Sequence, residues 1–133
     1  MKLKNVIYEL YEVDLISLHD HPEWHEIDRE ISLEFENGEK KYFSWCGEPV
    51  QYSVGVQDHR FNVNEPDHVI DATSWDLWQG LIGEEIEFIS HDESHQVLEL
   101  KGQSKSVYLS SQERGSWQAD VLHISTKLPK YGS

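Results

Sequence analysis

The residues with the richest chemistry lie close together near the N-terminus. His19 and His21 are separated by one residue, and His25 and Glu26 follow within the next five positions. Two imidazoles two residues apart on an extended segment point to the same side of the chain. Imidazole and carboxylate groups are ligands for zinc and other transition metals. This cluster is therefore a candidate metal site.

The spacing His19-x-His21-x4-Glu26 resembles the metal motif of the cupin family. The resemblance implies a metal-dependent β-barrel enzyme that uses these three residues and His25. It covers eight residues, and Val13 stands where the family has a leading glycine. A second motif with Pro-x-Gly ahead of a histidine is not found before His59. A solvated histidine-rich loop explains the same residues, so we keep the metal enzyme as the alternative.

The sequence offers little else for catalysis. Cys46 follows Trp45 at the end of an apolar segment, where a buried, unreactive thiol is the usual outcome. The chain has no Gly-x-Ser-x-Gly elbow, and Gly80-x-x-Gly83 lacks the lysine of a phosphate-binding loop. We therefore predict no catalytic residues and no cofactor.

Acidic residues are the most distinctive part of the composition. The chain has 25 Asp and Glu against 11 Lys and Arg, a net charge of −14. Residues 5–39 contain eleven acids, with Arg29 as their one base. Binding to nucleic acids and anionic membranes depends on Lys and Arg, so we expect neither as a partner. The charge favours a basic protein partner, although an acidic surface that keeps a small protein in solution explains it as well.

Most of the candidate partner-binding residues lie around a predicted hairpin in the N-terminal third. Acids around an aromatic anchor suit the rapid capture of a basic protein. The candidates are Glu23, Trp24, Glu26, Asp28, Glu30, Glu34, Glu36 and Glu39, with Asp92 and Glu93 from a later histidine-bearing turn.

In size, acidity, single-domain character and lack of a catalytic motif, the chain resembles the immunity proteins of bacterial toxin systems, including contact-dependent inhibition. The resemblance implies a non-enzymatic protein that binds and neutralises a cognate toxin domain, often a basic nuclease. It rests on general character and assigns no binding residues. A small-ligand pocket beside Trp75 and Trp78 is a further alternative, since paired indoles can stack on a sugar or a base.

The size and composition predict one folded domain over residues 1–133. The length is sufficient for a hydrophobic core, and 38% of the residues are hydrophobic. The single cysteine allows no internal disulfide, and the N-terminus lacks the pattern of a secretory signal. These features favour the cytoplasm. They leave the oligomeric state open.

Alternating apolar and β-branched residues predict a mainly β fold. We expect an antiparallel sandwich or strongly curved sheet of seven to nine strands. A long first strand is expected over 5–18, followed by a loop over 19–26. Further strands are expected at 30–36, in the second arm of the hairpin, and at 51–57, 85–90, 96–101, 105–110 and 117–125, with one short strand within 58–71.

Two details of the fold can be predicted more closely. Asn37-Gly38 indicates a hairpin, for which we expect a three-residue loop or a bulge that places Leu33 opposite Phe43 and Glu36 beside Lys40. The helical spacing of Trp75, Trp78 and Ile82 predicts one short helix at about 74–82 that packs its indoles on the sheet.

Overall fold

The predicted β sandwich is confirmed by a computed structural model that describes residues 1–18, 24–46, 53–91, 97–111 and 121–128. These residues form ten strands in two antiparallel sheets and one helical turn, α1 (Asp14–Ser17). No helix in the described part of the chain combines the length and apolar composition that crossing a bilayer requires.

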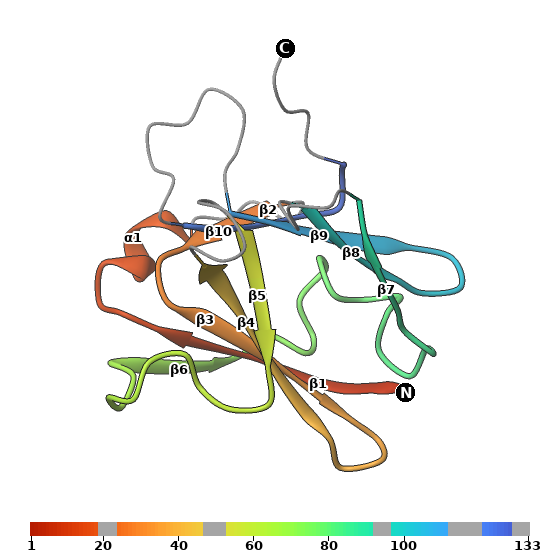
Figure 1. Ribbon diagram of the computed structural model, residues 1–133, viewed down its shortest axis with the longest axis horizontal. Coiled ribbons are helices and arrows are strands. Elements are labelled where there is room, and N and C mark those ends of the chain that lie inside the picture. The colour runs from red at the N-terminus through yellow and green to blue at the C-terminus, as the bar shows by residue number, and fades with distance from the viewer. Residues whose placement is uncertain (19–23, 47–52, 92–96, 112–120, 129–133) are drawn as a thin grey trace.

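The two sheets have five strands each and pack face to face (Figure 1). The first has the order β5-β4-β3-β1-β6, with the bounds β1 (Leu3–Leu10), β3 (Glu30–Phe35), β4 (Lys40–Cys46), β5 (Ser53–Gln57) and β6 (His68–Asp71). The second has the order β2-β10-β9-β8-β7, with the bounds β2 (Trp24–Ile27), β7 (Glu87–Ser90), β8 (Val97–Lys101), β9 (Ser106–Ser110) and β10 (Leu122–Ser125).

The core fills the space between the sheets. Alternate residues of each strand face it, as the period of two requires. Fully buried side chains include Tyr8, Leu33 and Phe43 from the first sheet and Leu100 and Leu109 from the second. The strands expected from 85 to 110 agree with β7, β8 and β9 to within two residues at each end.

The outer face of the first sheet is also partly buried, which the alternating pattern did not predict. In β3, Glu30 and Ser32 are both 0% exposed although they face away from the core. The reason is the segment 58–67, whose Phe61 N–H bonds to the Glu30 carboxylate at 2.8 Å. This segment therefore lies over the outer face rather than in solvent.

The hairpin between β3 and β4 has the three-residue loop that was predicted but a different register. Ile31 pairs with Phe43 and Leu33 with Lys41, so the expected Leu33–Phe43 pairing is wrong. The loop is Glu36-Asn37-Gly38, closed by a hydrogen bond from Phe35 N–H to Glu39 O, and Gly38 has a φ of 90°. The extra loop residue thus comes before Asn37-Gly38, which shifts every pair by two residues.

The expected first strand is too long, because β1 ends at Leu10. The Asp14 carboxylate accepts hydrogen bonds from the N–H of Tyr11 at 2.9 Å and of Asp28 at 2.7 Å. These bonds stabilise a turn that leads into α1, where β propensity alone had predicted more strand.

One other expectation is corrected. The chain over 24–27 is the strand β2, paired with β10, and not part of a loop. The last strand is described from Leu122, and the rest of its expected range, 117–120, lies outside the described residues.

The segment 72–84 forms successive turns instead of the expected helix over 74–82. Gly80 and Gly83 have φ values of 93° and 84°, which interrupt a right-handed helix. The Lys105 Nζ atom donates to the carbonyl oxygens of Asp76 and Gln79 at 2.9 and 2.7 Å. The turns still bury Trp78 completely, so the indole packs as predicted without a helix to carry it.

Candidate protein-binding surface

The acids of the β3–β4 hairpin lie among lysines. Glu34 pairs across the hairpin with Lys40, and its carboxylate accepts a hydrogen bond from the Asn5 amide at 2.8 Å. At the exposed tip, the Glu36 N–H bonds to the Lys2 carbonyl oxygen, and Glu39 is followed by two lysines. Carboxylates and ammonium groups are therefore interspersed at this end of the molecule.

Glu30 does not belong to the protein surface, which corrects its proposed role in partner binding. It is fully buried, and its neighbours are Phe61 N–H and the Arg29 guanidinium, 3.9 Å away. Burial raises the pKa of this carboxyl above its usual value. Glu30 therefore fastens an internal segment instead of meeting a partner.

Trp24 and Glu26 lie on β2 in the second sheet, away from the hairpin. Trp24 stacks on His123 with ring centroids 5.9 Å apart, and a Glu26 oxygen lies 3.5 Å from the His123 ring. Asp28 is half-buried in the connection between β2 and β3, and its carbonyl oxygen accepts a hydrogen bond from the Trp45 indole N–H. The remaining predicted residues, Glu23, Asp92 and Glu93, lie outside the described residues.

The predicted metal cluster is represented by His25 and Glu26, since His19 and His21 are outside the described residues. His25 faces the core, where its Nδ1 atom lies 2.9 Å from the Tyr8 hydroxyl, while Glu26 is on the opposite face of β2. The two side chains therefore diverge. Within the described ranges, no group of three His, Cys, Asp or Glu side chains is placed to hold a metal ion.

The paired tryptophans pack in the core. The Trp78 indole N–H donates to the Tyr8 hydroxyl at 2.9 Å, and the Trp75 ring packs edge-on against Tyr8 and His25. Burial raises the pKa of the Tyr8 phenol, which remains protonated and can donate to His25. These indoles are therefore structural and do not form an open stacking platform.

A histidine–glutamate pair lies on the second sheet. His91 Nε2 is 2.8 Å from a Glu99 oxygen, and Ser106 donates to the other oxygen of the same carboxylate. Burial opposes the charged form of Glu99, but these hydrogen bonds outweigh it and hold the pKa of the carboxyl below its usual value. The Glu99 carboxylate orients the His91 imidazole. Among the described contacts, no nucleophilic side chain lies against that imidazole.

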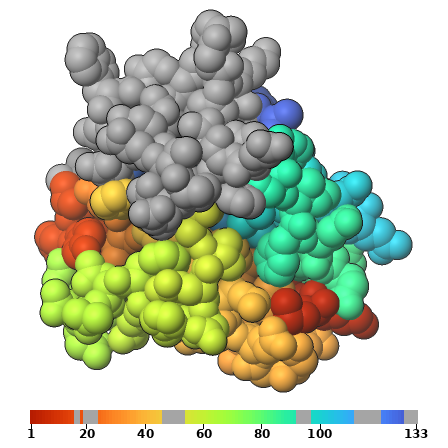
Figure 2. Space-filling model, in the orientation of Figure 1, coloured from red at the N-terminus to blue at the C-terminus, as the bar shows by residue number. Residues whose placement is uncertain are grey.

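A further group of exposed carboxylates lies on the segments 11–15 and 58–71. We define the acidic face as the four exposed carboxylates Glu12, Glu65, Asp67 and Asp71. The Asp67 carboxylate accepts the Glu12 N–H at 3.0 Å, which joins the two segments. In Figure 2 the red-orange atoms around α1 meet the lime-green atoms of 58–71 at the left of the molecule.

Exposed valines accompany these acids. Val63 is 94% exposed and Val69 is 60% exposed, and Val13 follows Glu12 directly. Asn62 donates to the Tyr11 hydroxyl, so the Val63 loop lies beside the turn that carries Glu12 and Val13. Apolar side chains with a charged rim are typical of a protein interface.

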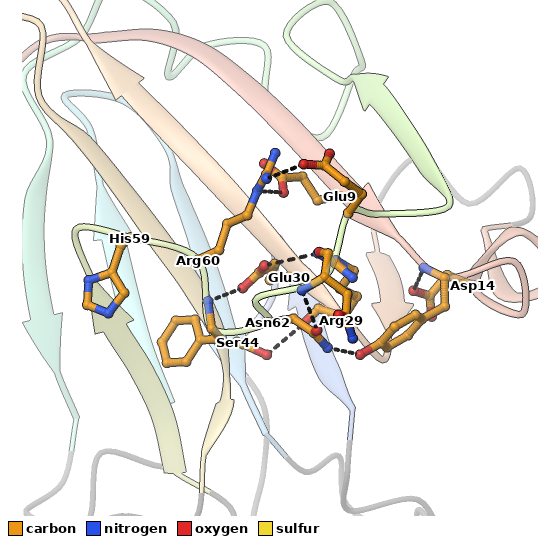
Figure 3. A network of polar contacts seen from close by, with 12 residues as sticks. Glu9, Asp14, Arg29, Glu30, Ser44, His59, Arg60 and Asn62 are labelled. Atoms are coloured by element: carbon orange, nitrogen blue, oxygen red, sulfur yellow. Dashed lines mark hydrogen bonds and ion pairs between the residues drawn. The ribbon is translucent and has the colours of Figure 1, made fainter.

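Two arginines near this face bond to neighbouring strands and loops (Figure 3). The Arg60 Nε atom donates to the buried Glu9 carboxylate at 2.6 Å, and its Nη1 lies 3.7 Å from Glu65. Arg29 is 3% exposed, donates to the Asn64 carbonyl oxygen at 2.5 Å and lies over the Tyr11 ring. Both guanidinium groups fasten the 58–67 segment to the sheet. Among the described residues Glu65 lies near Arg60 and Glu12 contacts His68, whereas Asp67 and Asp71 form no ion pair with a Lys or Arg.

Local sequence patterns do not point to these residues, because their acids are widely spaced along the chain. Residues 58–71 contain four acids and one Arg, which is unremarkable in a chain with 25 acids. The available signal was Val63 between two asparagines, an apolar residue in a segment otherwise typical of a turn.

Comparisons with protein-family models, with curated proteins and with solved structures find no match to this chain.

Proposed function

We propose that the chain is a non-enzymatic, immunity-type inhibitor that neutralises a cationic toxin domain, such as a nuclease, by masking its surface in the bacterial cytoplasm. The observation that carries the proposal is the acidic face. Its four carboxylates are exposed, while Arg29 is buried and Arg60 bonds to the buried Glu9 carboxylate.

Charge and shape both support this role. A surface with one dominant sign of charge raises the rate at which an oppositely charged protein is captured. The exposed Val63 and Val69 supply apolar area that a bound partner would bury. A domain that binds the basic active-site surface of a nuclease blocks its access to nucleic acid without any chemistry of its own.

The test is a titration of the purified chain against the basic toxin domain encoded by the adjacent gene, together with a growth assay in cells that express that domain. We expect tight binding and protection. The absence of both would overturn the proposal.

A charge-reversal pair locates the surface. The variant Glu12→Lys/Glu65→Lys/Asp67→Lys should weaken binding by on the order of 100-fold, because it replaces attraction by repulsion at three positions. The matched control Glu34→Lys/Glu36→Lys/Glu39→Lys changes the same number of charges at the hairpin and should weaken binding by less than about fivefold. The opposite ranking would assign the interface to the hairpin.

A further inference from the structure

The strand β6 ends the first sheet and borders the acidic face. Its one neighbour in the sheet order is β1, and the described residues place no strand on its other side (Figure 1). It is short, with four residues, and both of its flanking segments are described. Edge strands carry backbone groups that can pair with another chain.

The register identifies which backbone groups point outward. Ala72 N–H donates to the Val6 carbonyl oxygen at 2.9 Å, and the pairing continues in the same register through Tyr8–Ile70 and Leu10–His68. Hydrogen-bonded and non-hydrogen-bonded pairs alternate along an antiparallel ladder. The N–H and C=O groups of Val69 and Asp71 therefore point away from β1.

The side chains around this edge favour a basic segment over a second copy of the chain. Asp67 and Asp71 lie immediately before and at the end of β6, and Glu12 contacts both Asp67 and His68. Two copies paired along β6 would bring these carboxylates together, which costs free energy. Lysine or arginine side chains in the same positions would be attracted.

We propose that the edge of β6 binds an extended, basic segment of the partner as an added strand. Backbone hydrogen bonds to Val69 and Asp71 supply the pairing, the exposed Val69 side chain packs against an apolar residue of the segment, and the carboxylates contact its lysines or arginines. This inference rests on the proposed function and specifies how the toxin domain is held.

A proline substitution tests the edge directly. Val69→Pro removes an N–H that β1 does not use, and proline is tolerated on an edge strand when its N–H position faces solvent. We expect the variant to keep its fold and to bind the adjacent-gene toxin domain at least about tenfold more weakly. The matched control Val69→Thr keeps the N–H and the β-branched shape and should bind within about twofold of the wild type.

The outcomes separate the two proposals. If the wild type binds and Val69→Pro binds equally well, the strand addition is wrong and the proposed function stands. If the wild type itself fails to bind and to protect, the proposed function is wrong. A dimer of the wild type that Val69→Pro disrupts would make a second copy the occupant and overturn the strand addition.

Amide hydrogen exchange provides a test that does not depend on the variant's fold. In the wild-type complex, the amides of Val69 and Asp71 should exchange at least about tenfold more slowly than in the free chain, since each gains a hydrogen-bond partner. Unchanged exchange at both amides in a saturated complex would overturn the proposal.

Discussion

The acidic face and the β3–β4 hairpin have similar numbers of carboxylates but differ in the Lys and Arg residues that lie near them. The hairpin has Glu34, Glu36 and Glu39. Lys40 pairs with Glu34, Lys40 and Lys41 follow Glu39 in the sequence, and the backbone of Lys2 bonds to that of Glu36. Among the described residues, the one ion pair between the acidic face and a Lys or Arg joins Glu65 to Arg60, and that arginine also pairs with Glu9.

The difference shows that the charge of a surface depends on which groups the neighbouring Lys and Arg side chains contact. At the hairpin, exposed lysines stay near exposed acids, so the local field is nearly balanced. At the acidic face, the half-exposed Arg60 is shared between the buried Glu9 and the exposed Glu65, while the buried Arg29 bonds to the loop backbone. Contacts with the sheet and the loop thus use much of the positive charge near this surface.

The largest effect expected on this comparison is that of Glu30→Ala. Removing the buried carboxylate deprives the Phe61 N–H of its acceptor and the Arg29 guanidinium of its ion-pair partner. The free energy of unfolding should therefore fall by about 3 kcal/mol. The matched Glu36→Ala variant at the exposed hairpin tip should stay within about 0.5 kcal/mol of the wild type. Urea unfolding measures both. Equal, small losses would show that Glu30 does not fasten the 58–67 segment.

A smaller effect is expected for Gly38→Ala in the hairpin loop. Gly38 has a φ of 90° and open space where a Cβ would lie, so the cost is conformational, about 1 kcal/mol of stability. Affinity for the partner should be unchanged, because the hairpin lies outside the proposed interface. Thermal unfolding and titration of the same sample check the two statements, and a loss of affinity would place the hairpin in the interface.

The smallest effect expected is a pH dependence at Glu30. Because burial raises the pKa of this carboxyl above 4.5 in the folded state, its ionised form weakens the fold at neutral pH. That penalty is absent well below pH 4.5, develops as the pH rises from 4.5 to the folded pKa, and is constant above the folded pKa. Glu30→Gln should therefore gain stability relative to the wild type as the pH is raised from 4.5 to 7. Glu36→Gln should show no such trend, and a trend of the opposite sign would contradict the buried position of Glu30.

Much of the fold could be predicted from local patterns. Alternation over 30–36 and 85–110 gave strands at nearly the right residues, and Asn37-Gly38 marked the hairpin. The hairpin register could not be predicted, because the pairing that buries most apolar surface within two strands differs from the pairing that fits both sheets. The predicted helix at 74–82 failed because Lys105, from a distant loop, binds carbonyl groups that a helix would use.

The candidate site was the less predictable part. The alternation of β3 predicts that Glu30 is a surface acid, but the segment around Phe61, 31 residues later in the sequence, buries it. The partner-binding role predicted for Glu34, Glu36 and Glu39 is untested, and the interface that we propose lies instead at the acidic face, which was not among the predicted residues. Its members become neighbours only when β6 pairs with β1.

By itself, the sequence determined the class of fold, the excess of negative charge and the packing of Trp78 in the core, because these follow from composition and from local periodicity. Tertiary structure decided which acids are exposed, which groups the arginines contact and which strands lie at the sheet edges. Those properties depend on contacts between residues far apart in the chain, such as Arg60 with Glu9 and Phe61 with Glu30, and local patterns do not encode them.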